Sequence, residues 1–143
     1  MISAEPSVQV EQNKALVRRL MEGVYVDRNV DVLDELAAAD YTGSIPTLSF
    51  DSRDAWKAYN RASLSAFPDL AYTIDDLIAE GDRVVLRWTL TGTHRGAYGP
   101  VEPTGNRITV TGVFICRVAN GKIAHSVGVW DTASVMRQLG VQP

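Results

Sequence analysis

Apolar residues recur every three or four positions in the first half of the chain, which is the spacing of a helix that buries one face. Val10, Val17, Leu20 and Val24 form one such stripe and predict a helix over residues 8–26. Tyr25 lies near the end of this stripe. Its hydroxyl could point inward as a hydrogen-bond donor, or the side chain could lie at the surface.

Two more helices are predicted before residue 70. A short one begins at Asn29 or Asp31, since either side chain can cap a helix. A longer one runs from about Ser52 to Phe67 and ends at Pro68, because proline cannot continue a helix. The stretch between them, 41–50, is interrupted by glycine and proline and is predicted to be irregular.

From Leu70 onward the apolar period changes from helical spacing to two, the period of a half-buried strand. Gly81-Asp82 and Asn120-Gly121 are hairpin turn signals. The Gly- and Pro-rich connection 92–106 is long enough to be a functional loop or a rim. The first predicted strand begins at Leu70, and three more run over 84–91, 108–118 and 123–130. A final helix follows them and carries Val135, Met136 and Leu139.

The order of elements predicts one α+β domain over residues 1–143, with helices on one side of a curved antiparallel sheet. Length and composition are those of one globular domain, and the formal net charge of −3 gives no signature of nucleic-acid or anionic-membrane binding. No apolar run could span a bilayer and no signal peptide is apparent, so a cytoplasmic protein is expected. The single cysteine and the absence of an HxxxH motif predict neither a disulfide nor a metal site.

The Asn120-Gly121 turn predicts the register of the last hairpin. Counting outward from a two-residue turn pairs Cys116 with His125 and Gly112 with Val129, and the missing side chain of Gly112 leaves space opposite Val129. The face predicted to lie against the helices is apolar apart from a thiol, an imidazole and a carboxylate, which is typical of a small-molecule pocket. That face carries Val110, Gly112, Phe114, Cys116, Val118, Ile123, His125, Val127, Val129 and Asp131.

Asp131 permits two interpretations. A carboxylate in an apolar pocket can have its pKa raised toward neutrality, which suits a general acid or base. Asp131 also directly precedes the last helix, where aspartate is a favoured cap. His125, two positions away on the same predicted face, could relay a proton or bind a ligand carbonyl, or it could be a core histidine satisfied by a neighbour.

Further side chains are possible contacts for a ligand. His94 could line the pocket mouth or brace the long loop, and the Tyr41 hydroxyl could point inward. Cys116 lacks any accompanying oxyanion-hole motif, and small buried cysteines are common. Aromatic residues could stack on a flat ligand or simply fill the core, and two or three of five are expected to touch a cavity: Trp56, Tyr59, Phe67, Trp88 and Phe114.

Counting back from Gly81-Asp82 places Asp76 opposite Arg87 and Asp75 opposite Trp88. The first pair predicts a cross-strand ion pair. Asp75 could be a second pocket carboxylate, unless a bulge exchanges the two faces.

Several different short motifs are spread along almost the whole chain, from about Gln12 to Gly140. They are Ala79-Glu-Gly-Asp-Arg-Val-Val85, Gly92-Thr-His-Arg-Gly96, Pro103-Thr-Gly105, Arg117 with Gly121-Lys-Ile123, Trp130-Asp131 and Gln138-Leu-Gly140. In this order and spacing the sequence resembles the SnoaL-like polyketide cyclases of the nuclear transport factor 2-like superfamily. The resemblance implies a cone-shaped α+β fold, a curved sheet wrapped on three N-terminal helices with a short C-terminal helix, and a deep pocket.

The resemblance also implies a homodimer, no cofactor, a small hydrophobic polyketide-like substrate, and an aldol cyclisation in which Asp131 acts as general acid/base. The chain departs from the family pattern at Ser44, where histidine is frequent, and at His125 and Val127, where glutamate and tryptophan are frequent. Phe114 stands where a polar residue is often found. The pocket is therefore expected to be unusually apolar.

Several alternatives to the aldol reaction follow. They are a pericyclic cyclisation, a related isomerase or hydroxylase activity, and a binding or dimerisation module without catalysis. The absence of any Arg-x-Asp argues against the epoxide-hydrolase branch. An outward-facing set of side chains is consistent with a partner subunit: Thr109, Val113, Ile115 and Trp130.

Overall fold

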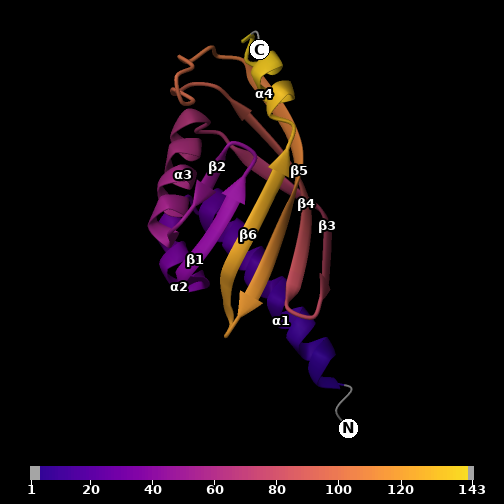
Figure 1. Ribbon diagram of the computed structural model, residues 1–143. Coiled ribbons are helices and arrows are strands. Elements are labelled where there is room, and N and C mark those ends of the chain that lie inside the picture. The colour runs from indigo at the N-terminus through magenta and orange to yellow at the C-terminus, as the bar shows by residue number, and fades with distance from the viewer. Residues whose placement is uncertain (1–3, 142–143) are drawn as a thin grey trace.

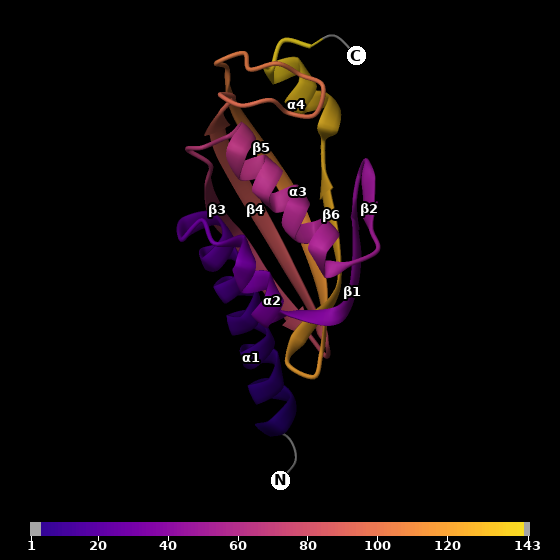
Figure 2. The same cartoon turned by 90° about the vertical axis from the view of Figure 1, so that its left-hand side faces the viewer.

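The computed structural model describes residues 4–141, and its helices gather on one side of a curved sheet (Figures 1 and 2). The helical elements are α1 (Ala4–Met21), a π-helical turn η1 (Glu22–Val26), a 3-10 turn η2 (Val30–Val32), α2 (Leu33–Leu36), α3 (Arg53–Ala66) and α4 (Thr132–Gln138). The predicted long first helix is confirmed, with its last turn widened into the π-helical turn. Ser52 caps α3, and its side chain accepts a hydrogen bond from the Ala55 amide at 3.1 Å.

Six strands form a single sheet in the order β2-β1-β6-β5-β4-β3. They are β1 (Ala37–Ile45), β2 (Leu48–Phe50), β3 (Ala71–Glu80), β4 (Arg83–Thr93), β5 (Arg107–Ala119) and β6 (Lys122–Trp130). The predicted α+β class and curved sheet are confirmed. β1 lies parallel to β6, and every other neighbouring pair is antiparallel.

The prediction that residues 41–50 are irregular is wrong, because this stretch contains most of β1 and all of β2. β1 pairs with β2 on one side and with β6 on the other, and β6 lies some eighty residues further along the chain, as in the pairing of Thr42 with His125. A pairing with so distant a partner leaves no trace in the local apolar period.

β6 contains a bulge that reverses the predicted faces of its outer half. The turn itself is as predicted, with positive φ at Asn120 (53°) and Gly121 (75°). Val118 pairs with Ile123, but Arg117 then pairs with His125, so β6 holds one extra residue at this point. One extra residue moves every later side chain to the opposite face.

The inward-facing residues of β6 beyond the bulge are therefore Ser126, Gly128 and Trp130. His125, Val127 and Val129 point outward, which corrects the predicted register. Trp130 was predicted to face outward and instead lines a cavity under the helices. Cys116 pairs with Ser126 and not with His125.

β3 contains a second bulge, at Asp75. Ile74 pairs with Trp88 and Asp76 pairs with Arg87, which leaves Asp75 as the extra residue. The predicted ion pair is confirmed, with 2.6 Å between Arg87 Nε and Asp76 Oδ2. The predicted placement of Asp75 opposite Trp88 is wrong, and its carboxylate accepts a hydrogen bond from the Thr89 hydroxyl at 2.6 Å.

Gly112 provides the space that the Trp88 indole occupies. The two residues pair across β4 and β5, and a Cβ at Gly112 would overlap the indole ring and the Val129 carbonyl oxygen. The space predicted beside Gly112 is therefore filled from β4. The absence of a side chain at this position lets a large aromatic ring lie close to the strand backbone.

We expect Gly112→Ala to lower the free energy of unfolding by about 1–3 kcal/mol, because the added methyl group overpacks a filled site. Urea denaturation followed by circular dichroism measures the change. Thr111→Ala is the matched control, since Thr111 is the exposed neighbour on the other face of the same strand. An unchanged unfolding midpoint for Gly112→Ala would contradict this account of the Trp88 packing.

Candidate functional site

A cavity of about 130 Å³ lies between the helices and the inner face of the sheet. Its walls come from α1, η1 and α2, from α3 and the segment after it, from β1 and strands β4 to β6, from the loop after β4, and from α4. The lining residues are Leu20, Met21, Val24, Tyr25, Leu33, Ile45, Trp56, Tyr59, Asn60, Ser63, Phe67, Leu70, Trp88, Leu90, Tyr98, Ile108, Val110, Phe114, Gly128, Trp130 and Val135.

No carboxylate, ammonium, guanidinium or imidazole group is among these lining residues of the described chain. The polar groups are three tyrosine hydroxyls, the Asn60 amide, the Ser63 hydroxyl and the tryptophan indoles. All three tryptophans of the chain lie in the cavity wall. A charged ligand group would lose its hydration here without gaining a counter-charge, so the cavity selects neutral molecules.

Helix α3 supplies one wall of the cavity through a regular stripe. Trp56, Tyr59, Asn60, Ser63 and Phe67 lie three or four positions apart and therefore on one face of the helix. Figure 2 shows α3 lying across the face of the sheet. This stripe combines aromatic surface with hydrogen-bonding groups.

A short chain of hydrogen bonds connects η1 to α3 inside the cavity wall. The Tyr25 hydroxyl donates to Asn60 Oδ1 at 3.0 Å, and Asn60 Nδ2 donates to the Trp56 carbonyl oxygen at 2.9 Å. Burial raises the pKa of Tyr25 to about 12. Tyr25 therefore stays protonated at neutral pH and holds Asn60 in a fixed orientation.

Burial also raises the pKa of Tyr59 above its usual range, and the nearby phenol groups of Tyr98 and Tyr25 raise it further. The Ser63 side chain partly offsets this rise. The proton of the Ser63 hydroxyl goes to the Tyr59 main-chain oxygen, 3.1 Å away. Burial therefore keeps these phenol groups neutral at neutral pH.

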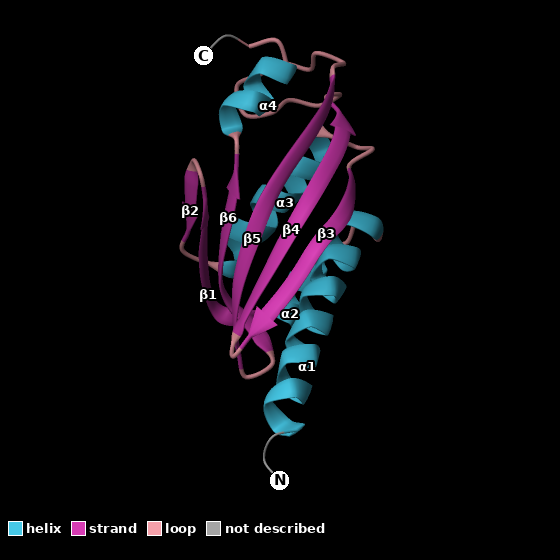
Figure 3. Cartoon of the chain, turned by 90° about the vertical axis from the view of Figure 1, so that its right-hand side faces the viewer, coloured by secondary structure: helices cyan, strands magenta, loops and turns pink. Residues whose placement is uncertain are grey.

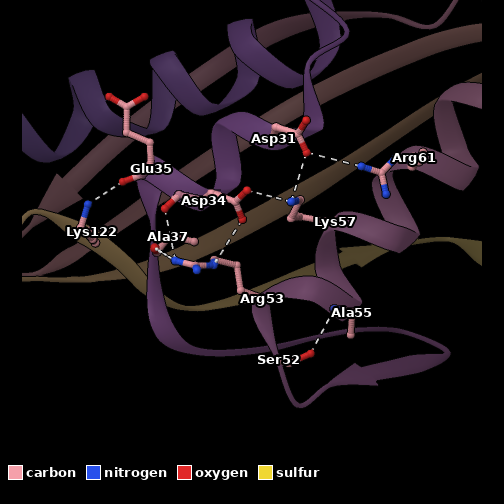
Figure 4. Close-up of polar contacts among 10 residues, drawn as sticks. All are labelled: Asp31, Asp34, Glu35, Ala37, Ser52, Arg53, Ala55, Lys57, Arg61 and Lys122. Carbon is pink, nitrogen blue, oxygen red and sulfur yellow. Dashed lines mark hydrogen bonds and ion pairs between the residues drawn. The ribbon is translucent and has the colours of Figure 1, made fainter.

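Charged residues outside the cavity fix the position of α3 (Figure 4). Lys57 Nζ lies 2.9 Å from Asp34 Oδ2 and 3.1 Å from Asp31 Oδ1, and the hydrogen bond from Lys57 lowers the pKa of Asp34. Arg53 donates to the main-chain oxygens of Asp34 and Ala37, each at 3.2 Å. The network connects the first half of α3 to η2, α2 and the start of β1.

The five aromatic residues predicted as possible cavity contacts all line the cavity, more than the two or three expected. They are Trp56, Tyr59, Phe67, Trp88 and Phe114. The helical and strand periods predicted their faces correctly because α3, β4 and β5 run without a bulge through these positions. Whether these side chains bind a substrate stays a prediction.

Two other predicted ligand contacts, Tyr41 and Val129, lie elsewhere. Tyr41 is buried behind Trp56, with ring centroids 4.3 Å apart, and its hydroxyl shares a 2.6 Å hydrogen bond with Ser126. Val129 points outward and is 53% exposed. Neither of them lines the cavity, Tyr41 because Trp56 covers it and Val129 because of the β6 bulge.

His94 is fully buried but is not a lining residue. Its Nδ1 accepts a hydrogen bond from the Thr104 amide at 3.1 Å, and the Thr104 hydroxyl lies 3.0 Å away. The His94 amide bonds to the Asn106 carbonyl oxygen at 2.9 Å. His94 therefore braces the base of the long loop, the second of its two predicted roles.

Asp131 does not face the cavity, so its predicted position is wrong. Its side chain is 66% exposed, and Oδ1 accepts a hydrogen bond from the Ser134 amide at 3.0 Å. Arg137 lies at 4.0 Å from the other carboxylate oxygen. Asp131 is the N-cap of α4, and this geometry gives no support to its predicted proton-transfer role.

His125 also points away from the cavity. Its Nδ1 lies 2.9 Å from the Thr42 hydroxyl on β1. The prediction that His125 and Asp131 share a pocket wall is wrong, because the extra residue in β6 turns this face outward. Cys116 is buried, and burial raises the pKa of its thiol, so it is poorly suited to act as a nucleophile.

Among the polar and aromatic lining residues, four were not anticipated as site residues: Asn60, Ser63, Tyr98 and Trp130. Asn60 and Ser63 could have been found, because they follow Trp56 by four and seven positions on the face of a predicted helix. Tyr98 lies in a loop without periodicity. Trp130 could not be placed without knowledge of the bulge.

No cluster of three or more His, Cys, Asp or Glu side chains in the described part of the chain could hold a metal ion. Among residues 4–141, no helix is long and apolar enough to cross a membrane.

Comparison with known proteins identifies the family. A family model described as SnoaL-like polyketide cyclase matches residues 15–139. A search of the curated proteins found no match.

Solved structures share the fold over nearly the whole chain. TsrD from Streptomyces laurentii is 29% identical with a TM-score of 0.79, covering 90% of this chain and 97% of TsrD. AclR from Streptomyces galilaeus, for which a hydroxylase activity has been put forward, is 28% identical with a TM-score of 0.83, covering 94% and 84%. IdmH from Streptomyces antibioticus, for which a polyketide cyclase activity has been put forward, is 27% identical with a TM-score of 0.78, covering 91% and 99%.

If Asp131 is only a helix cap, Asp131→Asn and Asp131→Ala should differ in their effect on the free energy of unfolding. Asp131→Asn keeps a capping side chain and should leave the free energy of unfolding almost unchanged, whereas Asp131→Ala should lower it by about 1 kcal/mol. Urea denaturation measures both variants. Any cavity ligand should bind the Asn variant with parental affinity, and a clear loss of affinity would restore a pocket role for the carboxylate.

Proposed function

The chain belongs to the SnoaL-like polyketide cyclase family, and from that premise we propose that it binds a neutral, hydrophobic, polyketide-like carbonyl compound in the cavity under α3. The protein holds this compound in the folded shape from which an intramolecular ring closure proceeds. The observation that carries the proposal is the chemistry of the cavity wall, which is rich in aromatic rings and contains no charged group among the described residues.

Such a wall favours ring closure by confinement over ring closure by a strong base. Holding two reacting ends of one molecule at contact distance can supply a large part of the barrier reduction. The rings of Trp56, Trp88, Phe114 and Trp130 provide surfaces against which a conjugated chain can pack. A pericyclic cyclisation, which moves electrons within the substrate, suits this environment better than an aldol reaction that relies on Asp131.

The volume limits the part of the substrate that is enclosed. An apolar cavity of roughly 150 Å³ holds one benzene molecule, so a cavity of about 130 Å³ accommodates a portion of similar size. The cavity is partly open to solvent, and the remainder of a longer substrate would extend through the mouth. The enclosed portion would contain the carbons that form the new ring.

A second candidate function is a binding module of the same fold without catalysis. The absence of an acid or base in the cavity wall favours it as much as it favours a pericyclic reaction. A related isomerase or hydroxylase activity would need a reactive group that the described cavity residues do not supply. The two surviving candidates share the cavity as their ligand site and differ only in whether the bound compound is converted.

We expect the cavity to bind acetophenone and to reject benzoate at pH 7.5, with affinities at least about tenfold apart, because burying the benzoate charge is costly. The indole Nε1–H signals of the three tryptophans in ¹H–¹⁵N NMR spectra report binding inside the cavity. Val110→Phe fills the cavity and should abolish the acetophenone shifts. Val26→Phe, at a residue of η1 that is 60% exposed and lies away from the sheet, should leave them intact.

Equal binding of benzoate and acetophenone at these indoles would contradict the proposed selection of neutral ligands. Binding of acetophenone to Val110→Phe with unchanged affinity would show that the ligand site lies outside the cavity.

We also propose that the outer face of the sheet joins two copies of the chain. Figure 3 views this face, and the described helices all lie behind the strands or at their ends. Cross-strand partners place Val85 beside Ile115, Ile115 beside Val127, and Val113 beside Val129. These apolar pairs form a continuous patch, and a second copy covering it would remove it from water.

Ile115→Lys should convert the dimer into a monomer, because it introduces a charge at the centre of the outer patch. Light scattering after size exclusion should give about twice the chain mass of 15.6 kDa for the parent and the single-chain mass for the variant. Val26→Lys is the control, since Val26 is 60% exposed and lies on η1 away from this face. A monomeric parent protein would contradict the dimer.

A further inference from the structure

We propose that Tyr59 and Tyr98 form a two-donor subsite that binds the carbonyl oxygen of the substrate and stabilises the negative charge that grows on it during ring closure. This inference rests on the proposed function, because it assigns the recognition of the carbonyl group to two named hydroxyls. It adds a polar contact to a site whose other walls select only for shape and neutrality.

The two tyrosines reach the cavity from different elements. Tyr59 belongs to the cavity stripe of α3, and Tyr98 belongs to the loop that follows β4. Phe67, at the end of α3, packs against Tyr98 with ring centroids 5.7 Å apart, so the loop and the helix meet directly. Both side chains line the same cavity of about 130 Å³.

Three other polar side chains of the cavity have already committed a proton. The Tyr25 hydroxyl donates to Asn60, the Asn60 amide donates to the Trp56 carbonyl oxygen, and Ser63 donates to the Tyr59 main-chain oxygen. Within residues 4–141 the Tyr98 hydroxyl makes no hydrogen bond, and the polar side chain beside the Tyr59 hydroxyl is Ser63, whose own proton goes to the Tyr59 main-chain oxygen. These two phenols are therefore donors available to a ligand.

Hydrogen bonds hold the loop that carries Tyr98 both at its turn and at its base. Tyr98 and Val101 exchange main-chain hydrogen bonds of 2.9 and 3.0 Å, which closes a tight turn around Gly99. The buried His94 closes the base of the loop through the Thr104 amide, and the Gly96 amide bonds to the Ala66 carbonyl oxygen of α3. The Tyr98 hydroxyl is thus positioned by a braced scaffold, as a preorganised donor requires.

Neutral phenol donors suit a carbonyl group in an apolar cavity. Burial raises the pKa of both tyrosines, so they keep their protons at neutral pH and cannot act as bases there. A hydrogen bond in such a medium strengthens as charge develops on the accepting oxygen, so it favours the transition state over the bound substrate. No proton needs to leave the tyrosines during the reaction.

The test compares acetophenone with α-methylstyrene, which has the same shape but a methylene group in place of the oxygen. Both compounds are titrated into the parent protein, Tyr59→Phe, Tyr98→Phe and the double variant, with the tryptophan indole NMR signals as readout. Tyr72→Phe is the matched control, because Tyr72 packs on Tyr25 and does not line the cavity. The infrared C=O stretch of bound acetophenone gives an independent measure of hydrogen bonding.

Each single variant should lose about twofold to tenfold in acetophenone affinity, the loss expected for one hydrogen bond. The affinity for α-methylstyrene should stay within about twofold in all variants, which also shows that the cavity remains folded. The C=O stretch should lie at lower frequency in the parent protein than in hexane and return toward the hexane value in the double variant.

Equal losses for both compounds, or no loss for either, would overturn the subsite and leave the neutral apolar cavity of the proposed function intact. A hexane-like C=O stretch in the parent protein would do the same without any variant. If neither compound binds the parent protein, the cavity is not a site for such ligands, and both the subsite and the proposed function fall.

Discussion

The extra residue in β6 is the constraint on which the composition of the cavity depends. It lies where β6 pairs with β5 on one side and with β1 on the other, and the register of β1 shifts at the same level. Because side chains alternate along a strand, one inserted residue exchanges the two faces of everything beyond it. Trp130 enters the cavity for this reason, and His125 leaves it. A sheet with the same residues and no bulge would present an imidazole and a carboxylate to the substrate.

Because the described cavity wall contains no charged group, only its neutral polar groups can bind a polar atom inside the cavity. In water a phenol is a modest hydrogen-bond donor, but in a wall of aromatic and aliphatic side chains it has little competition from solvent. The chain commits the Tyr25, Asn60 and Ser63 protons to its own oxygen atoms. The ion-pair network around Lys57 lies outside this wall, where it fixes α3 without bringing charge into the cavity (Figure 4). The charged residues and the cavity wall therefore occupy neighbouring faces of the same helix.

The sequence predicts the structure correctly where residues that are close in the chain determine which face a side chain occupies. The α3 stripe from Trp56 to Phe67 and the alternation around Trp88 and Phe114 follow from periods of 3.6 and 2, and all five predicted aromatic residues line the cavity. The prediction fails where a distant partner decides. β1 forms because β6 is beside it, and the bulges at Asp75 and near His125 insert one residue that no local pattern marks. The faces of the last strand could therefore be read only from the structure.

Asp131 illustrates how one residue type can satisfy two incompatible expectations. An aspartate at the junction of strand and helix meets the sequence requirement of a cap, and its exposed carboxylate accepts the Ser134 amide. A general acid or base would need the same carboxylate to be desolvated beside the substrate. The oxygen atoms that cap α4 lie in solvent, so one carboxylate in this position cannot do both. The proposed ring closure therefore relies on groups that stay neutral, namely confinement by aromatic rings and hydrogen bonds from phenols.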